Sequence, residues 1–473
     1  MKHKSLLLLV ALLLNIHAVF AQGKAVITGK ISNPLSDEIT VAISPDPLVP
    51  EEVKTAVKLK GGSFRLEVPV NGATVAELLH DDEVVPVYLE PGFELNLTFN
   101  GDRFLKSLKF EGKGASENNY LVQYTRRFDE VEEYQVMPDN IKLPEKEFTA
   151  FLEYRKKDQL KNLEKYTAKN PLSERFRKFA LAEINFGYAN DKITYQSLRE
   201  RTLMTARLQK PSAEFYDFLS QLDMHSTENL LSYTFVSFLR NYTTYYTNET
   251  GLQETDKAYF KTAYTIAGQK LQGQVKSVAQ AHILKQSIQV GHLKYTNEML
   301  QDFRASNKSP ELEAYFAKLY SQHKEFAIGS PAPDFQLKDM NGAGVSLSDF
   351  KGKVVYLNFW STSCGLCMVE MPNMQQLTSQ LKDKDVVFLN VGMDEDEANW
   401  KKTVTGRKLQ GVHVYTKGMD AELVKRYNLK DIPAYFLIDE EGNFISVKPR
   451  RPADREAVNE ILRHLNQGQA SAR

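Results

Sequence analysis

The stretch Lys353-Val-Val-Tyr-Leu-Asn-Phe-Trp360-Ser-Thr-Ser-Cys364-Gly-Leu-Cys367 decides how the C-terminal part of this chain folds. From Lys353 to Trp360 the residues are mainly apolar, β-branched or aromatic, which is typical of a strand buried on both faces. After Cys367 the apolar residues follow a helical spacing: Met368, Met371, Met374 and Leu377. The two cysteines therefore lie where a buried strand passes into a helix N-terminus, and the free N–H groups and dipole at such a terminus favour a thiolate.

These are the only two cysteines among 473 residues. At this spacing they could form an inert disulfide, half of a metal site or a redox pair. Zinc takes about four ligands, no third cysteine exists, and the nine histidines show no paired spacing. We therefore favour redox chemistry and expect neither a metal nor a cofactor.

The first 21 residues predict a secretory signal peptide. A basic start, Met1-Lys-His-Lys4, precedes an apolar segment from Leu6 to Leu14, and cleavage is expected after Ala21. An apolar helix of that length rises ~14 Å, too short for a ~30 Å bilayer core. No cysteine follows to carry a lipid anchor. We expect an exported, periplasmic protein that is soluble after cleavage.

Charge argues against some partners. The chain has 60 basic and 60 acidic residues and no dense block of Lys or Arg. The charge distribution therefore gives no electrostatic support for binding to nucleic acid or to anionic membranes.

Residues 22–112 predict an antiparallel β sandwich or barrel. Apolar and alternating segments of strand length, such as 26–31, 63–68 and 93–99, are separated by turn sequences like Gly61-Gly62 and Asn100-Gly101. The region contains no catalytic cluster, and we interpret it as a binding or spacer module.

Residues 113–326 predict an all-α region of about seven to nine helices. Apolar residues recur at helical spacing, for example Leu312, Tyr315, Phe316 and Leu319. Aromatic residues are dense, and such a stripe either packs in the core or lines a recognition groove. Presenting partners to the redox site, or forming a homodimer, is the role that we expect for this region.

Residues 327–473 alternate strand and helix and end in a hairpin and a C-terminal helix, expected from Ala453 to Asn466. Parallel βαβ units followed by an antiparallel hairpin predict an α/β fold. This segment resembles the thioredoxin-fold domain of the TlpA/ResA-like family of exported thiol-disulfide oxidoreductases. The resemblance is carried by 329–337, by 345–360 with the two cysteines, and by the segment Asp431-Ile432-Pro433-Ala434, which looks like the family's cis-proline loop.

The resemblance implies a thioredoxin-like fold and a protein-disulfide oxidoreductase. Cys364 would attack a partner disulfide and Cys367 would resolve the intermediate, leaving a Cys364–Cys367 disulfide. Trp360, Ile432 and Pro433 would bind substrate, with the backbone of Ile432 pairing with an incoming peptide. The partners would be protein thiols or disulfides and an upstream electron donor.

Glu370, three residues after Cys367, matches an acidic position of ResA-like members. If it is buried, desolvation would raise its pKa and let it carry protons for Cys367. The alternative is a solvated helix carboxylate.

Two positions depart from the family pattern and leave the direction of electron flow open. Leu366 stands where the family usually has proline, and Ser363 where it commonly has tryptophan. Leu366 adds a backbone N–H that proline lacks, and a donor aimed at the Cys364 sulfur would stabilise its thiolate.

Two other functions remain as alternatives. In the first, the protein is a partner-binding protein with a secondary redox domain. In the second, it is a peroxiredoxin-like peroxidase, which Ser361 and Leu357 oppose because that chemistry needs threonine and proline there.

Overall fold

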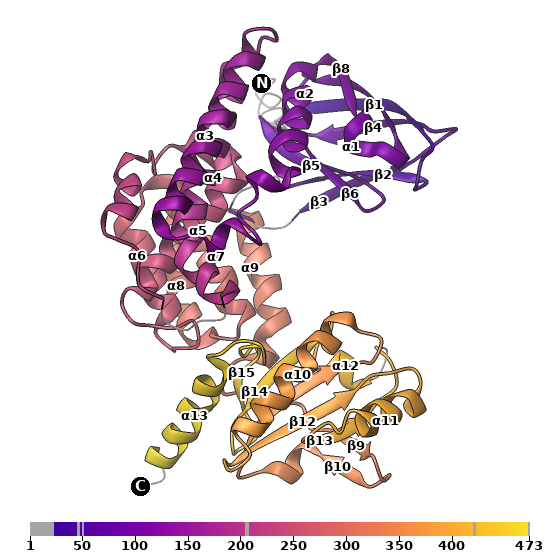
Figure 1. Ribbon diagram of the computed structural model, residues 1–473, viewed down its shortest axis with the longest axis vertical. Coiled ribbons are helices and arrows are strands. Elements are labelled where there is room, and N and C mark those ends of the chain that lie inside the picture. The colour runs from indigo at the N-terminus through magenta and orange to yellow at the C-terminus, as the bar shows by residue number, and fades with distance from the viewer. Residues whose placement is uncertain (1–22, 45–47, 50–51, 204–207, 420–421, 472–473) are drawn as a thin grey trace, which may run out of the picture. The chain divides into compact units, whose positions relative to one another are not determined.

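The computed structural model describes residues 23–44, 48–49, 52–203, 208–419 and 422–471 (Figure 1). The predicted signal peptide, residues 1–21, lies outside the described residues. The chain divides into two compact units, one made of residues 1–189 and 226–235, the other of 190–225 and 236–473. Helices α4 and α5 each begin in the first unit and end in the second.

The first unit contains two four-stranded sheets, ordered β4-β1-β7-β8 and β3-β2-β5-β6. Their strands are β1 (Lys24–Ser32), β2 (Glu38–Ile43), β3 (Val53–Lys58), β4 (Ser63–Pro69), β5 (Thr74–His80), β6 (Glu83–Leu89), β7 (Glu94–Asn100) and β8 (Lys109–Lys113). Alternate residues of β4 and β7 are buried, as the alternating sequences predict. Both sheets contribute to one hydrophobic core, so they form a sandwich.

Two features of the sandwich differ from the sequence-based expectation. Strands β1 and β7 pair in parallel, with Val26 opposite Glu94, whereas the other pairs are antiparallel. The core also continues past the strands into helices, through residues such as Tyr120, Leu163 and Phe176. Helix α2 contacts β6 and β8, so it covers apolar side chains that the sheets alone would leave in water.

Eight α-helices lie between residues 115 and 323 within the described part of the chain, in line with the predicted seven to nine. They are α2 (Ala115–Tyr124), α3 (Glu145–Thr167), α4 (Glu174–Thr202), α5 (Tyr233–Asn248), α6 (Tyr259–Lys270), α7 (Gly273–Gln289), α8 (Leu293–Ser306) and α9 (Pro310–His323). A short helix, α1 (Phe104–Ser107), precedes them. Helix α9 begins as its sequence predicts, because Ser309 caps it by accepting a hydrogen bond from the Leu312 N–H and Pro310 occupies its first turn.

The C-terminal part of the second unit contains a seven-stranded sheet ordered β10-β9-β13-β12-β11-β14-β15. Strands β11, β12 and β13 are parallel, and β14 and β15 add the predicted antiparallel hairpin. The strands are β9 (Gln336–Asp339), β10 (Gly344–Ser346), β11 (Val354–Trp360), β12 (Val386–Gly392), β13 (Val412–Tyr415), β14 (Ala434–Ile438) and β15 (Phe444–Ser446). The helices are α10 (Gly365–Gln380), α11 (Glu397–Gly406), α12 (Glu422–Arg426) and α13 (Ala457–Ser471).

Strand β11 lies inside this sheet between β12 and β14, and all seven of its residues are buried. Val354 and Tyr356 pack on one face with α10 and α13, and Val355, Leu357 and Phe359 pack on the other face with α12. This two-faced burial explains why the strand sequence is continuously apolar. It also places Trp360 on the same face as helix α10, since side chains alternate along a strand.

The last helix begins later than expected, at Ala457 instead of Ala453. Asp454 ends the preceding turn by accepting a hydrogen bond from the Glu456 N–H and pairing with Arg450 at 2.7 Å. Among the described residues, none of the helices is both long and apolar enough to cross a membrane.

Candidate active site

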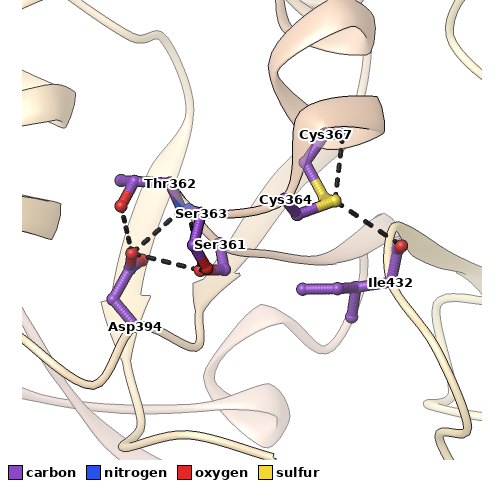
Figure 2. The surroundings of a disulfide bond; sticks show 7 residues. All are labelled: Ser361, Thr362, Ser363, Cys364, Cys367, Asp394 and Ile432. Carbon is purple, nitrogen blue, oxygen red and sulfur yellow. Dashed lines mark hydrogen bonds between the residues drawn. A yellow bond between two sulfur atoms is a disulfide. The ribbon is translucent and has the colours of Figure 1, made fainter. Parts of the chain in front are cut away.

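The cysteine loop connects the end of β11 to the start of α10. Trp360 is the last residue of the strand, and Cys364 caps the helix with an extended backbone, φ −84° and ψ 108°. Cys367 lies within the first turn. The two cysteines are joined by a disulfide, with their Cα atoms 5.2 Å apart (Figure 2).

A buried carboxylate holds this loop, and the sequence analysis did not identify it. Asp394 lies just after β12 and is 5% exposed. Its Oδ1 accepts hydrogen bonds from the Thr362 N–H at 2.9 Å, from the Ser361 hydroxyl at 3.1 Å and from the Thr362 hydroxyl (Figure 2). Asn399 on α11 donates to the same Thr362 hydroxyl at 2.7 Å. Three donors on one oxygen fix the backbone from which Cys364 projects.

Cys364 is half-buried and its sulfur has two polar neighbours. The backbone N–H of Cys367 donates to Sγ at 3.1 Å, the geometry of a side-chain helix cap. Sγ also lies 3.5 Å from the carbonyl oxygen of Ile432, an acceptor that a reduced thiol can use (Figure 2). The N–H donor and the helix terminus both stabilise negative charge on this sulfur once the disulfide is reduced.

The sequence analysis considered the Leu366 N–H as the hydrogen-bond donor to the Cys364 sulfur, and the structure shows a different donor. Among the described residues the donor to the Cys364 sulfur is Cys367 and not Leu366. A capping side chain reaches the N–H groups of the second or third helical residue, and here it bonds the third. The Leu366 side chain is instead 62% exposed beside the disulfide.

Cys367 is 4% exposed and packs in an apolar cluster with Trp360, Met371, Trp400 and Val404. Trp360 itself is 2% exposed, because it is on the face of β11 that α10 covers. Its ring therefore packs in the same cluster as Cys367 and is not available as the substrate contact that we expected. The exposed apolar side chains near the disulfide are Leu366 and Val369, which is 70% exposed.

The Ile432–Pro433 peptide bond is cis. Ile432 approaches the disulfide from the loop before β14, as Figure 2 shows. Pro433 lines a cavity of about 30 Å³ together with Cys367 and Glu370. This arrangement brings residues 364, 367, 432 and 433 together although some 65 residues separate the two pairs in the sequence.

Glu370 is partly exposed and lines the cavity beside Cys367. Its Oε2 accepts a hydrogen bond from the Ala453 N–H at 3.1 Å. The same cavity is lined by Asn358, Trp360 and His413, whose Oδ1, Nε1 and Nδ1 atoms are buried without a partner in the described structure. Burial lowers the pKa of His413, so this imidazole is neutral at pH 7. The cavity has room for a water molecule that could bridge these groups.

No group of three or more His, Cys, Asp or Glu side chains that could hold a metal is present among the described residues. The site consists of sulfur, backbone amides and a carbonyl. A cysteine pair in these surroundings can exchange disulfides with another thiol or disulfide.

Comparisons with known proteins agree with this chemistry. The Redoxin family profile matches residues 327–462. The thiol-disulfide oxidoreductase ResA of Bacillus cereus is 34% identical over 146 residues, 31% of this chain and 83% of the relative. ResA of Bacillus thuringiensis is 34% identical over 153 residues, 32% of this chain and 84% of the relative.

Solved structures also match this region. The thioredoxin domain of a thiol-disulfide oxidoreductase from Bacteroides vulgatus is 32% identical, with 30% of this chain and 99% of that chain covered and a TM-score of 0.28. Through its C-terminal domain, the chain belongs to the ResA family of thiol-disulfide oxidoreductases.

Proposed function

We propose that the protein is exported and exchanges disulfides with other proteins through Cys364 and Cys367. The observation that carries the assignment of these residues is the position of the Cys364 sulfur. It caps helix α10, accepts the Cys367 N–H and faces the Ile432–Pro433 loop. A half-buried sulfur with these neighbours can react with a partner, whereas the sulfur of Cys367 is covered.

The reaction begins from the reduced dithiol. The Cys364 thiolate attacks one sulfur of a partner disulfide, a mixed disulfide forms, and the other partner sulfur leaves as a thiolate. Cys367 then loses its proton and attacks the Cys364 sulfur, which releases the second partner sulfur. The partner has gained two electrons, and the Cys364–Cys367 disulfide has formed. An upstream dithiol donor restores the reduced pair by the same steps in reverse.

Glu370 is our candidate for taking the Cys367 proton, because both line the same cavity. Its hydrogen bond to the Ala453 N–H holds the carboxylate in place. A Glu370→Gln variant keeps that acceptor and removes the base. We expect slower decay of the mixed disulfide in this variant and an unchanged rate of Cys364 alkylation.

The substrate-binding part of the proposal rests on the Ile432–Pro433 loop and on the apolar side chains that surround the disulfide. Leu366 and Val369 expose apolar surface beside Cys364, which suits contact with a polypeptide more than with a small polar thiol. Leu366→Asp should therefore slow exchange with a protein disulfide more than exchange with a small-molecule disulfide.

The decisive experiment is dithiol-dependent reduction of insulin by the purified protein. Cys364→Ser should abolish it, while Cys367→Ala should accumulate a mixed disulfide that non-reducing electrophoresis and mass spectrometry detect. A double variant, Cys364→Ser with Cys367→Ala, serves as the control. Wild-type activity no higher than that of the control would refute the function, and export is tested separately by sequencing the N-terminus of the secreted protein.

A further inference from the structure

A second candidate site lies far along the sequence from the cysteines, in the first compact unit. A cavity of about 110 Å³ opens among β5, β6, α2, α4 and the start of α5. All of its lining residues belong to this unit. The volume is several times the space that one water needs. Neither the family resemblance nor the redox chemistry assigns any role to it.

Aromatic rings form much of the wall. Tyr120 and Tyr124 come from α2, Phe179 from α4, and Tyr233 from the first residue of α5. The centroids of the Tyr120 and Tyr124 rings are 6.0 Å apart. Tyr233 is 47% exposed and donates its hydroxyl to the Val75 carbonyl oxygen. Rings arranged around a cavity offer several negative π faces to a cation.

Two carboxyl groups, Asp129 and Glu183, complete the lining. Asp129 ends a single π-helical turn, Thr125–Asp129, that follows α2, and such turns occur frequently at functional sites. The side chain of Asp129 is exposed at the surface, yet desolvation by the surrounding protein raises its pKa to about 6, and the charge of Glu183 contributes to this shift. Desolvation also raises the pKa of Glu183, against hydrogen bonds from Ser232 and Thr234.

Neither carboxyl group has an ion-pair partner within the described part of the chain. The positive charge of Arg155 offsets part of the pKa shift of Asp129, and Arg155 donates a hydrogen bond to the Tyr134 carbonyl oxygen at 3.1 Å. An added positive charge would stabilise the ionised forms of both carboxyl groups.

An independent observation comes from Tyr120. This side chain is 1% exposed, and its hydroxyl has no hydrogen-bond partner among the described residues. A buried hydroxyl without a partner costs free energy unless water or a ligand satisfies it. Because Tyr120 lines the cavity, a bound molecule with a hydroxyl or amine group can supply that partner.

We propose that this cavity binds a small organic ammonium ion, with the charged head between the aromatic rings and the two carboxylates. A neutral apolar ligand would leave both carboxylates without a counter-charge. A hard metal ion takes six or more oxygen ligands, which this mostly aromatic and aliphatic lining does not supply. An alkylammonium group matches both the rings and the acids.

Choline and its neutral isostere 3,3-dimethylbutan-1-ol test the proposal, because they differ in charge and hardly in shape. Isothermal titration calorimetry on the full-length protein at pH 7.5 should show choline binding, with the isostere weaker by about tenfold or more. Nα-acetyl-lysine amide distinguishes the source of the cation. Tighter binding of this probe than of choline would assign the same cation chemistry to a protein side chain.

Asp129→Asn should weaken choline binding about tenfold by removing one charge. Glu183→Gln should have a similar effect while keeping an oxygen for the Thr234 hydroxyl, and circular dichroism verifies that both variants fold. Glu133→Gln, an exposed acid outside the cavity, is the matched control and should bind like the wild type. Binding should also weaken at pH 5, where Asp129 is protonated. The charged groups acting on Asp129 there are Glu183, Glu130 and Arg155.

Equal affinity for choline and its isostere would overturn the proposal, and so would an absence of binding by all three probes. Wild-type affinity in Asp129→Asn would overturn it as well. Cys364→Ser should bind choline normally, so the result is independent of the proposed redox function.

Discussion

The cysteine site and the aromatic cavity differ in how their residues are distributed along the chain. Cys364 and Cys367 lie at the cap and in the first turn of one helix, directly after a recognisable strand. The cavity combines residues from β5, β6, α2, α4 and α5, between Val75 and Tyr233. Chemistry that depends on short spacing leaves a motif in the sequence, whereas a site assembled from distant elements leaves none.

The largest expected effect separates these two sites. Cys364→Ser should abolish insulin reduction, because the remaining Cys367 is buried and has no second cysteine with which to complete the exchange. Choline binding should remain unchanged in the same variant. The assay follows insulin turbidity. Activity of Cys364→Ser above that of the double-cysteine control would show that Cys364 is not the nucleophile that this reaction requires.

Asp394 tests how far the cysteine site depends on support from a distant residue. Asp394→Ala removes the acceptor of three hydrogen bonds to the loop and should lower kcat/KM about tenfold, which corresponds to about 1.4 kcal/mol, within the range of about 1–3 kcal/mol for a buried polar group that loses its partner. Asp394→Asn keeps an oxygen acceptor and should retain more activity. Equal activity of both variants and the wild type would mean that the loop holds its position without this side chain.

The Cys364 thiol should titrate well below the ~8.5 of a free cysteine, because the Cys367 N–H and the helix terminus favour the thiolate. Exchange should therefore slow as the pH falls through that lowered pKa and reach a plateau above it. Thiolate absorbance near 240 nm against pH, in a Cys367→Ala background, measures it. An unshifted pKa of Cys364 would contradict the inference that the helix cap stabilises its thiolate.

Asp129 tests the electrostatics of the cavity without any ligand. Its folded-state pKa of about 6 is above the ordinary 3.8, so the folded state favours the protonated form. This contribution to stability is complete below pH ~4 and is lost as the pH rises through 6.

Asp129→Asn removes this pH-dependent loss. Given the solvent access of the group, the variant should be more stable than the wild type by about 1 kcal/mol at pH 7.5 and equal to it near pH 4. Urea unfolding at both pH values measures the difference, with Glu133→Gln as the control. A stabilisation that does not depend on pH would point to a cause other than charge.

The smallest expected effect concerns a truncation that leaves only residues 327–473. We predict that residues 327–473 alone fold and reduce a small disulfide at nearly the full-length rate, because they contain the complete sheet with helices α10 to α13. Turnover of a protein disulfide should decrease if residues 22–326 bind partners. If the fragment and the full-length protein reduced each substrate at equal rates, residues 22–326 would have no role in partner binding. A folded but inactive fragment would show that the preceding residues complete the site.

Much of the redox region could be predicted from the sequence because its signals are local. Three sequence patterns each predict the structure of the segment in which they occur. They are the continuous apolar run of β11, the helical spacing after Cys367 and the segment Asp431-Ile432-Pro433. Asp394 was missed although it follows the strand next to β11. The carboxyl ends of parallel strands meet at one edge of a sheet, so an acid at that position was a usable signal.

The sequence by itself determined the three kinds of secondary-structure pattern, the family of the C-terminal domain and the position of the cysteine pair at a strand-to-helix junction. Periodicity and short motifs carry this information because backbone geometry repeats over a few residues. Only the tertiary structure decided that Trp360 is covered, that the Cys367 N–H bonds the sulfur and that β1 pairs in parallel with β7. It also placed Asp129 and Glu183 in one aromatic cavity. Burial, pKa shifts and convergent side chains depend on which distant elements pack together, and local patterns do not record that packing.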